Sequence, residues 1–152
     1  MPPPGRPHPV GAEAAVGWLV ERFDRAEWQA RLGELAGSVR LEWQRYAEQA
    51  VLTAALAAEV PAPDGGDWRH RLTWSSFVRE IAVARRCSDQ AAGKEIYLAV
   101  ALVRTHRRTL SLLQAGVLPL RNAKVLVEEC VGCDPAVAAA VEAELAELAC
   151  QL

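Results

Sequence analysis

The sequence combines abundant helix-forming residues with an absence of strand signals, and this combination constrains the fold most strongly. Alanine, leucine, glutamate, arginine and glutamine dominate residues 11–60, and 51% of the 152 residues are hydrophobic, which is enough to form a core. No stretch alternates apolar and polar residues, and no Asn-Gly or Asp-Gly turn separates two apolar runs. We therefore predict an all-α helical bundle.

Proline and glycine divide the chain into four segments, which we expect to form one domain. Residues 1–10 are rich in proline and predict a disordered leader. Residues 11–60 predict an N-terminal helical hairpin, and residues 61–72, which begin with PAPDGGD, predict a linker loop. Residues 73–152 predict a second helical unit with a helix-turn-helix-like centre.

Within the N-terminal hairpin, Trp18, Leu19 and Phe23 mark one short helix, and Asp24 is a candidate N-cap for the next. A longer helical stretch from Ser38 is apolar on two faces, which is typical of a helix at the centre of a bundle. One face carries Val39, Trp43, Ala47, Ala50, Ala54 and Ala57, and the other carries Leu41, Leu52 and Leu56.

Capping and stop signals define the helices of the second unit. The predicted helices run from Thr73 or Ser75 to about Arg85, onward from Ser88, from about Thr105 to Ala115, from Pro119 to about Val131, and onward from Pro135. Gly116 and Gly132 are expected to end two of them. Asp134 before Pro135 is a strong start signal for the last.

The last helix carries an apolar stripe at helical spacing. Its members are Val137, Ala140, Val141, Leu145, Leu148 and Leu152. Such a stripe needs a neighbour, which could be the rest of this domain, a second copy in a homo-oligomer, or a portion absent from this chain. The last alternative treats the chain as a truncated remnant of a longer protein.

The net charge of −2 conceals a segregation of charge along the chain. Residues 1–67 carry 6 basic and 10 acidic side chains, residues 68–108 carry 9 and 3, and residues 109–152 carry 2 and 6. A basic centre favours contact with a polyanion, although the same side chains can pair with the acidic flanks instead. No apolar run approaches the roughly 20 residues of a membrane span, and no signal peptide is recognisable, so we expect a cytoplasmic location and no membrane partner.

The pattern of residues 77–104 predicts a helix-turn-helix unit. Ile81 and Ala82 lie in its first helix, Cys87 is the apolar turn residue, and Ser88 caps the second helix. Three residues depart from the standard pattern: Arg86 in place of a turn glycine, Arg85 in place of an apolar residue, and Asp89, which would repel phosphate.

The stretch from Arg79 to Glu128 resembles the actinobacterial domain of unknown function 222, also called the thirteen-E-twelve repeat family. The matching residues are Glu80, Ile81, Ala82, Ser88, Ala91, Ala92, Ala99, Ala101, Leu102, Leu113, Gly116, Leu118 and Ala123. In that family the domain usually precedes an HNH endonuclease module. The resemblance therefore implies the N-terminal, non-catalytic part of such a protein. More distantly, the same order of helices resembles the DNA-binding domain of chromosome-partition proteins.

An HNH nuclease needs a histidine set and a structural asparagine on a hairpin-and-helix finger, which together hold a divalent ion and activate water. This chain has one asparagine, Asn122, and its three histidines, His8, His70 and His106, are far apart in the sequence. We therefore expect no enzymatic activity and no cofactor.

Two further groups of residues offer no recognisable chemistry. Cys130 and Cys133 form a lone CxxC without two more ligands at zinc-finger spacing, so we predict no metal site. Five carboxylates lack a nearby histidine, serine or metal partner and predict solvated faces. They are Glu128, Glu129, Glu142, Glu144 and Glu147.

The candidate site is a set of basic residues that would contact the phosphates of double-stranded DNA. Its members are Arg85, Arg86, Lys94, Arg104, His106, Arg107 and Arg108, with Gln90 as the candidate reader of a base edge. The hypothesis requires the basic knot at residues 104–108 to lie beside Arg85, Arg86 and Lys94. The alternatives are a solvent-exposed junction at His106 and, for the whole chain, a protein-interaction or oligomerisation module.

Overall fold

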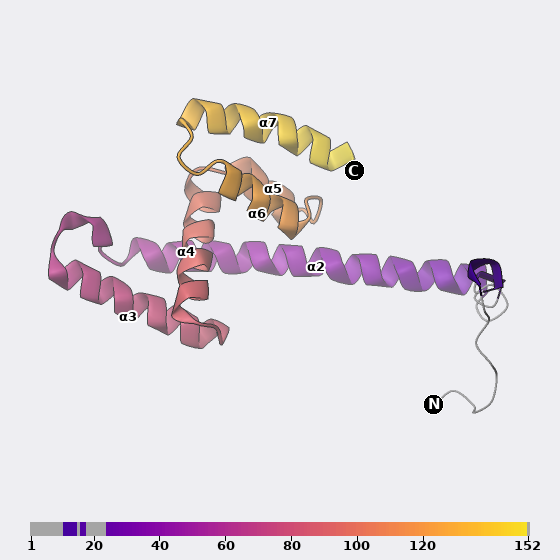
Figure 1. Ribbon diagram of the computed structural model, residues 1–152, viewed down its shortest axis with the longest axis horizontal. Helices are drawn as coiled ribbons and strands as arrows, with labels where there is room; N and C mark the ends of the chain where they lie inside the picture. The colour runs from indigo at the N-terminus through magenta and orange to yellow at the C-terminus, as the bar shows by residue number, and fades with distance from the viewer. Residues whose placement is uncertain (1–10, 15, 18–23, 152) are drawn as a thin grey trace. The chain divides into compact units, whose positions relative to one another are not determined.

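A computed structural model describes residues 11–14, 16–17 and 24–151 of the chain (Figure 1). Every regular element in these ranges is helical, which confirms the all-α prediction. The elements are α2 (Arg25–Ala58), the 3-10 helix η1 (Pro63–Gly65), α3 (Trp68–Arg85), α4 (Asp89–Arg104), α5 (Arg107–Gln114), α6 (Leu120–Glu129) and α7 (Pro135–Gln151). None of these helices combines the length and hydropathy needed to cross a bilayer.

The chain forms two compact units, Met1–Val39 and Arg40–Leu152, and the boundary falls inside α2. The helical stretches expected from Asp24 and from Ser38 are one continuous helix of 34 residues. Neither a proline nor a turn interrupts its backbone hydrogen bonds, which explains why the two stretches merge. The short helix predicted around Trp18, Leu19 and Phe23 lies outside the described residues.

The loop before α3 is shorter than the predicted linker of residues 61–72. Asp67 is the N-cap of α3, and its carboxylate accepts a hydrogen bond from the Arg69 N–H at 2.9 Å. The hydroxyl of Thr73, an expected cap, instead donates to the Arg69 carbonyl at 2.8 Å from inside the helix. Aspartate is a favoured N-cap, so the helix begins at the earlier of the possible caps.

A tight turn at residues 86–88 joins α3 to α4, as predicted. The Cys87 N–H donates to the Ala82 carbonyl at 3.0 Å and ends α3. The Ser88 hydroxyl accepts from the Ala91 N–H at 3.1 Å and caps α4. Arg86 between them has a left-handed backbone with φ of 54°, the conformation that glycine adopts at least cost.

Arg86→Gly is expected to raise the free energy of unfolding by about 0.5–1 kcal/mol, because glycine removes the left-handed strain at this position. Arg71→Gly is the matched control, since the same substitution at an exposed position inside α3 should lower stability by about 1 kcal/mol. Urea denaturation of the two variants measures both changes. Destabilisation by Arg86→Gly would contradict a strained turn.

The core of the second unit is built on the alanine face of α2. Ala47, Ala50 and Ala54 join one buried cluster with residues of α4, α5 and α6, and Ala57 joins another with residues of α3 and α4. The opposite face is largely exposed, although Leu52 and Leu56 border a groove next to α3. Leu41, Leu52 and Leu56 are 54%, 65% and 53% exposed, so the expectation that both faces of α2 are buried is wrong.

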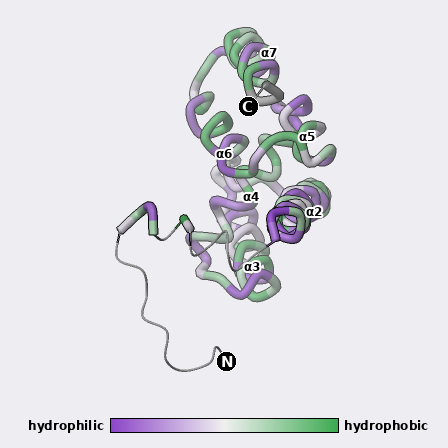
Figure 2. The backbone as a smooth tube through the Cα atoms, turned by 90° about the vertical axis from the view of Figure 1, so that its right-hand side faces the viewer, coloured by the Kyte–Doolittle hydropathy of each residue, from purple (hydrophilic) through white to green (hydrophobic). Residues whose placement is uncertain are grey.

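Helix α4 connects the two halves of this unit, with α3 at its beginning and α5 and α6 at its end (Figure 1). Helix α7 packs on α5 and α6, beyond the end of α4. Although much of α7 is hydrophobic (Figure 2), its inward face carries Ala138, Glu142 and Ala146. The predicted stripe points largely outward: Val137, Leu145 and Leu148 are 52%, 41% and 54% exposed.

Candidate functional site

One exposed face of α4 gathers Gln90, Lys94, Tyr97 and Arg104. Steps of four, three and seven residues return to the same side of a helix, and all four side chains are exposed. In the part of the chain that the structure describes, no carboxylate lies within ion-pair distance of Lys94 or Arg104. Three predicted site residues therefore share a surface. Tyr97 was not predicted as a site residue, although its spacing from Lys94 and Arg104 indicates the same face of the helix.

A groove between α4 and α6 borders this face and is lined in part by Lys94, Tyr97, Glu95 and Lys124. The carboxylate of Glu95 is compensated, because Lys124 Nζ lies 3.3 Å from its Oε1 and the Tyr46 hydroxyl donates to its Oε2 at 2.6 Å. Burial raises the pKa of Tyr46, and the hydrogen bond to Glu95 raises that pKa further. The hydroxyl therefore stays protonated and keeps Glu95 paired.

The start of α4 is also less acidic than the sequence indicates. Asp89, which would repel phosphate there, lies 3.5 Å from Arg79 of α3. Both side chains are exposed, so the pair is weak but lowers the local negative charge. The exposed face of α4 therefore has a partly compensated carboxylate, Asp89, at its start, and the exposed Glu128 of α6 lines the groove beside Lys94.

The predicted basic residues do not form one cluster. Arg86 lies at the turn before α4, whereas Arg104, Arg107 and Arg108 lie at or after its last residue. The 16 residues of α4 separate the two groups by about 24 Å at 1.5 Å per residue. The hypothesis required the knot at residues 104–108 to lie beside Arg85, Arg86 and Lys94. The knot lies at the other end of α4 from Arg85 and Arg86, and it begins ten residues after Lys94.

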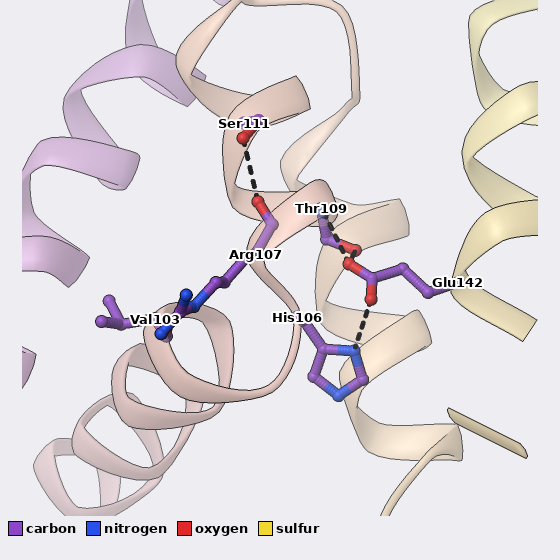
Figure 3. A network of polar contacts seen from close by, with 6 residues as sticks. All are labelled: Val103, His106, Arg107, Thr109, Ser111 and Glu142. Atoms are coloured by element: carbon purple, nitrogen blue, oxygen red, sulfur yellow. Dashed lines mark hydrogen bonds and ion pairs between the residues drawn. The ribbon is translucent and has the colours of Figure 1, made fainter. Parts of the chain in front are cut away.

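Two of these arginines are engaged with the protein itself. Arg85 is partly buried and lines a groove between α2 and α3, together with Leu52 and Ile81. Arg107 is exposed, and its Nε donates to the Val103 carbonyl at 3.3 Å, close to the end of α4 (Figure 3). Arg86 and Arg108 are exposed.

His106 lies in the interior, 4% exposed, and not at the surface as expected. It is the residue before α5, and its side chain makes no capping hydrogen bond. Its Nδ1 is buried without a hydrogen-bond partner, 3.9 Å from Oε2 of Glu142 (Figure 3). A buried imidazole cannot reach a phosphate outside the protein, so His106 leaves the candidate set.

Glu142 of α7 is buried, 6% exposed, and this corrects the expectation of a solvated carboxylate. Its Oε1 accepts hydrogen bonds from the backbone N–H of Thr109 at 2.8 Å and from the Thr109 hydroxyl at 2.9 Å. The carboxylate thus satisfies donors at the N-terminus of α5, where the helix dipole also favours negative charge. The sequence did contain one indication of this contact. His106, the residue before α5, is a poor N-cap residue, so the donors at this helix start needed another acceptor.

The CxxC pair shows no metal-binding arrangement. Cys130 is buried and Cys133 is exposed, and burial raises the pKa of the Cys130 thiol. Among the residues that the structure describes, no group of three histidine, cysteine, aspartate or glutamate side chains could hold an ion. A raised thiol pKa also disfavours the reactive thiolate.

Comparisons of the chain with models of protein families, with curated proteins and with solved structures find no match.

Proposed function

We propose that this chain is a non-catalytic helical module that associates with double-stranded DNA through the exposed face of α4. The observation that carries the proposal is the alignment of Gln90, Lys94 and Arg104 on one surface, with no described carboxylate paired to either cation. Because phosphate contacts dominate the affinity of proteins for DNA, unpaired cations on one face are what such a module needs.

The spacing along α4 suits a groove of DNA. Lys94 and Arg104 are ten residues apart, which is about 15 Å along a helix and comparable to the roughly 12 Å width of the major groove. The two cations can then contact phosphates on either side, while Gln90, one turn before Lys94, is the candidate for a base edge. Arg86 and Arg108 are also exposed, one before the start of α4 and one after its end.

The resemblance of residues 79–128 to the actinobacterial domain of unknown function 222 motivates a further part of the proposal, namely that the chain belongs to that family. Under this proposal the module binds DNA, and DNA cleavage is the task of the HNH nuclease module found in longer members of the family. The packing of α3 on α4 across a three-residue turn suits a helix-turn-helix unit with α4 as the recognition helix.

Duplex DNA is expected to bind the wild-type chain with an affinity that falls steeply with salt, and Lys94→Glu with Arg104→Glu should weaken binding at least tenfold. The plot of log affinity against log salt concentration has a negative slope, and its magnitude should decrease by about 2, which is one for each lost phosphate contact. Fluorescence anisotropy of a labelled duplex across a salt series measures both effects.

The matched control is Arg69→Glu with Arg71→Glu. It makes the same charge change at exposed positions near the start of α3, about 21 Å or more along that helix from its junction with α4. Equal losses in the two double variants would show that only net charge matters. Absence of binding by the folded wild type at low salt would end the DNA proposal.

The second candidate function is an oligomerisation module, which the exposed outer face of α7 favours. Val137, Leu145 and Leu148 present apolar surface that no described element covers. A dimer measured by light scattering in a chain that does not bind DNA would select this function.

A further inference from the structure

Helix α7 is held to the rest of its unit by little apolar surface. Among residues 135–148, whose side chains the structure describes, the buried ones are Ala138, Glu142 and Ala146. The buried members described for the cluster next to α6 are Leu126, Cys130 and Ala138. Val141 is partly buried against this cluster, whereas Val137, Leu145 and Leu148 are exposed. A helix with so little buried apolar area can open locally at much lower cost than the core helices.

The contact of α7 with α5 is instead centred on one carboxylate (Figure 3). Three polar groups converge on Glu142: the backbone N–H of Thr109, its hydroxyl, and the unpartnered Nδ1 of His106, which is 4% exposed and lies 3.9 Å away. Thr109 itself is fully buried. The N–H and hydroxyl of Thr109 make this helix start a site for an anion, and Glu142 fills it.

We propose that this site, formed by Thr109, His106 and the start of α5, is a receptor for a glutamate presented on a helix, and that α7 is an exchangeable latch. In the single chain, α7 fills its own receptor. The second occupant is the α7 of another copy, which inserts its Glu142 in the same way. This inference is independent of DNA binding.

We choose a second copy as the occupant because the structure shows that α7 fits the site at Thr109 and His106. Its small residues at positions 138 and 146 allow the approach that brings Glu142 to Thr109. Every copy carries an identical helix, joined to α6 by a short turn that contains Gly132 in a left-handed conformation. The chain's own α7 is covalently linked to the site and therefore has the higher effective concentration there. Its replacement by the α7 of another copy needs a high concentration of that copy.

The test adds a fluorescently labelled synthetic peptide of residues 134–152 to the full-length chain and follows anisotropy to equilibrium. The wild-type peptide should bind saturably, and a Glu142→Gln peptide at least tenfold more weakly. A Glu144→Gln peptide is the matched control, because Glu144 is exposed on the same helix, and it should bind like wild type. A chain with Glu142→Gln, whose own latch is weakened, should bind the wild-type peptide more tightly than the wild-type chain does.

Each outcome decides the proposal. Selective loss with the Glu142→Gln peptide supports a glutamate receptor. Equal binding of all three peptides to the wild-type chain would overturn it, because the carboxylate would then not be recognised. Absence of binding to both the wild-type chain and a Glu142→Gln chain that remains helical by circular dichroism would show that α7 does not exchange. The peptide comparison in the wild-type chain does not depend on the folding of any variant.

Discussion

Replacing Glu142 with alanine is expected to lower the free energy of unfolding by about 3 kcal/mol. The substitution removes the acceptor of two hydrogen bonds from Thr109, at 2.8 and 2.9 Å. Because Thr109 is fully buried, water can replace the carboxylate only if α7 separates from α5. Relief of the buried charge offsets part of the loss, but two buried donors left without a partner cost more. Urea denaturation followed by far-ultraviolet circular dichroism measures the change.

Glu144→Ala is the matched control for this prediction, since it removes an exposed carboxylate from the same helix. Its effect should stay within about 0.5 kcal/mol. Thr109→Val keeps the backbone donor and removes only the hydroxyl, so it should cost about 1 kcal/mol. If Glu142→Ala were as mild as Glu144→Ala, the buried carboxylate would contribute nothing to the docking of α7.

Local capping signals placed the starts of α4 and α7 well, although they missed the start of α3. Ser88 caps α4, and Asp134 accepts a hydrogen bond from the Ala136 N–H at 2.8 Å at the start of α7. Gly116 and Gly132, with φ of 68° and 77°, follow the ends of α5 and α6. These features depend on the residue and its near neighbours along the chain, so the sequence contains the information needed to predict them.

Helical periodicity did not determine which face of a helix is buried. In α2 the alanine face is buried and the leucine face is exposed, and in α7 Ala138 and Ala146 face inward while Leu145 and Leu148 face outward. Periodicity identifies the faces of a helix, but the neighbouring helices decide which face is covered. The position of those neighbours is a property of the whole fold.

The same limit explains the two errors at the candidate site. His106 and Glu142 are far apart in the sequence, and only the packing of α7 on α5 brings them together. The predicted basic residues are closer in sequence, yet the length of α4 separates Arg86 from Arg104. Spacing within one helix, as for Lys94 and Arg104, was the part of the site that the sequence could define.

Leu102→Ala is expected to lower the free energy of unfolding by about 3 kcal/mol and the melting temperature by about 9 °C. Leu102 is fully buried in the cluster that joins α4 to α2, α5 and α6. Several of its neighbours in this cluster are alanines, including Ala47 and Ala99, which have no rotamers that could fill the space left by the leucine side chain. The cavity therefore persists, and its cost adds to the loss of apolar burial.

Leu52→Ala is the matched control, because Leu52 is 65% exposed on the uncovered face of α2. Its truncation should change stability by less than about 0.5 kcal/mol. Thermal and urea denaturation of the two variants, compared with wild type, measure the difference. Similar losses at the two positions would mean that the leucine face of α2 is covered in solution, and would favour an oligomer in which a second copy packs on α2. A large loss at Leu102 alone would establish the alanine face of α2 as the one that carries the core.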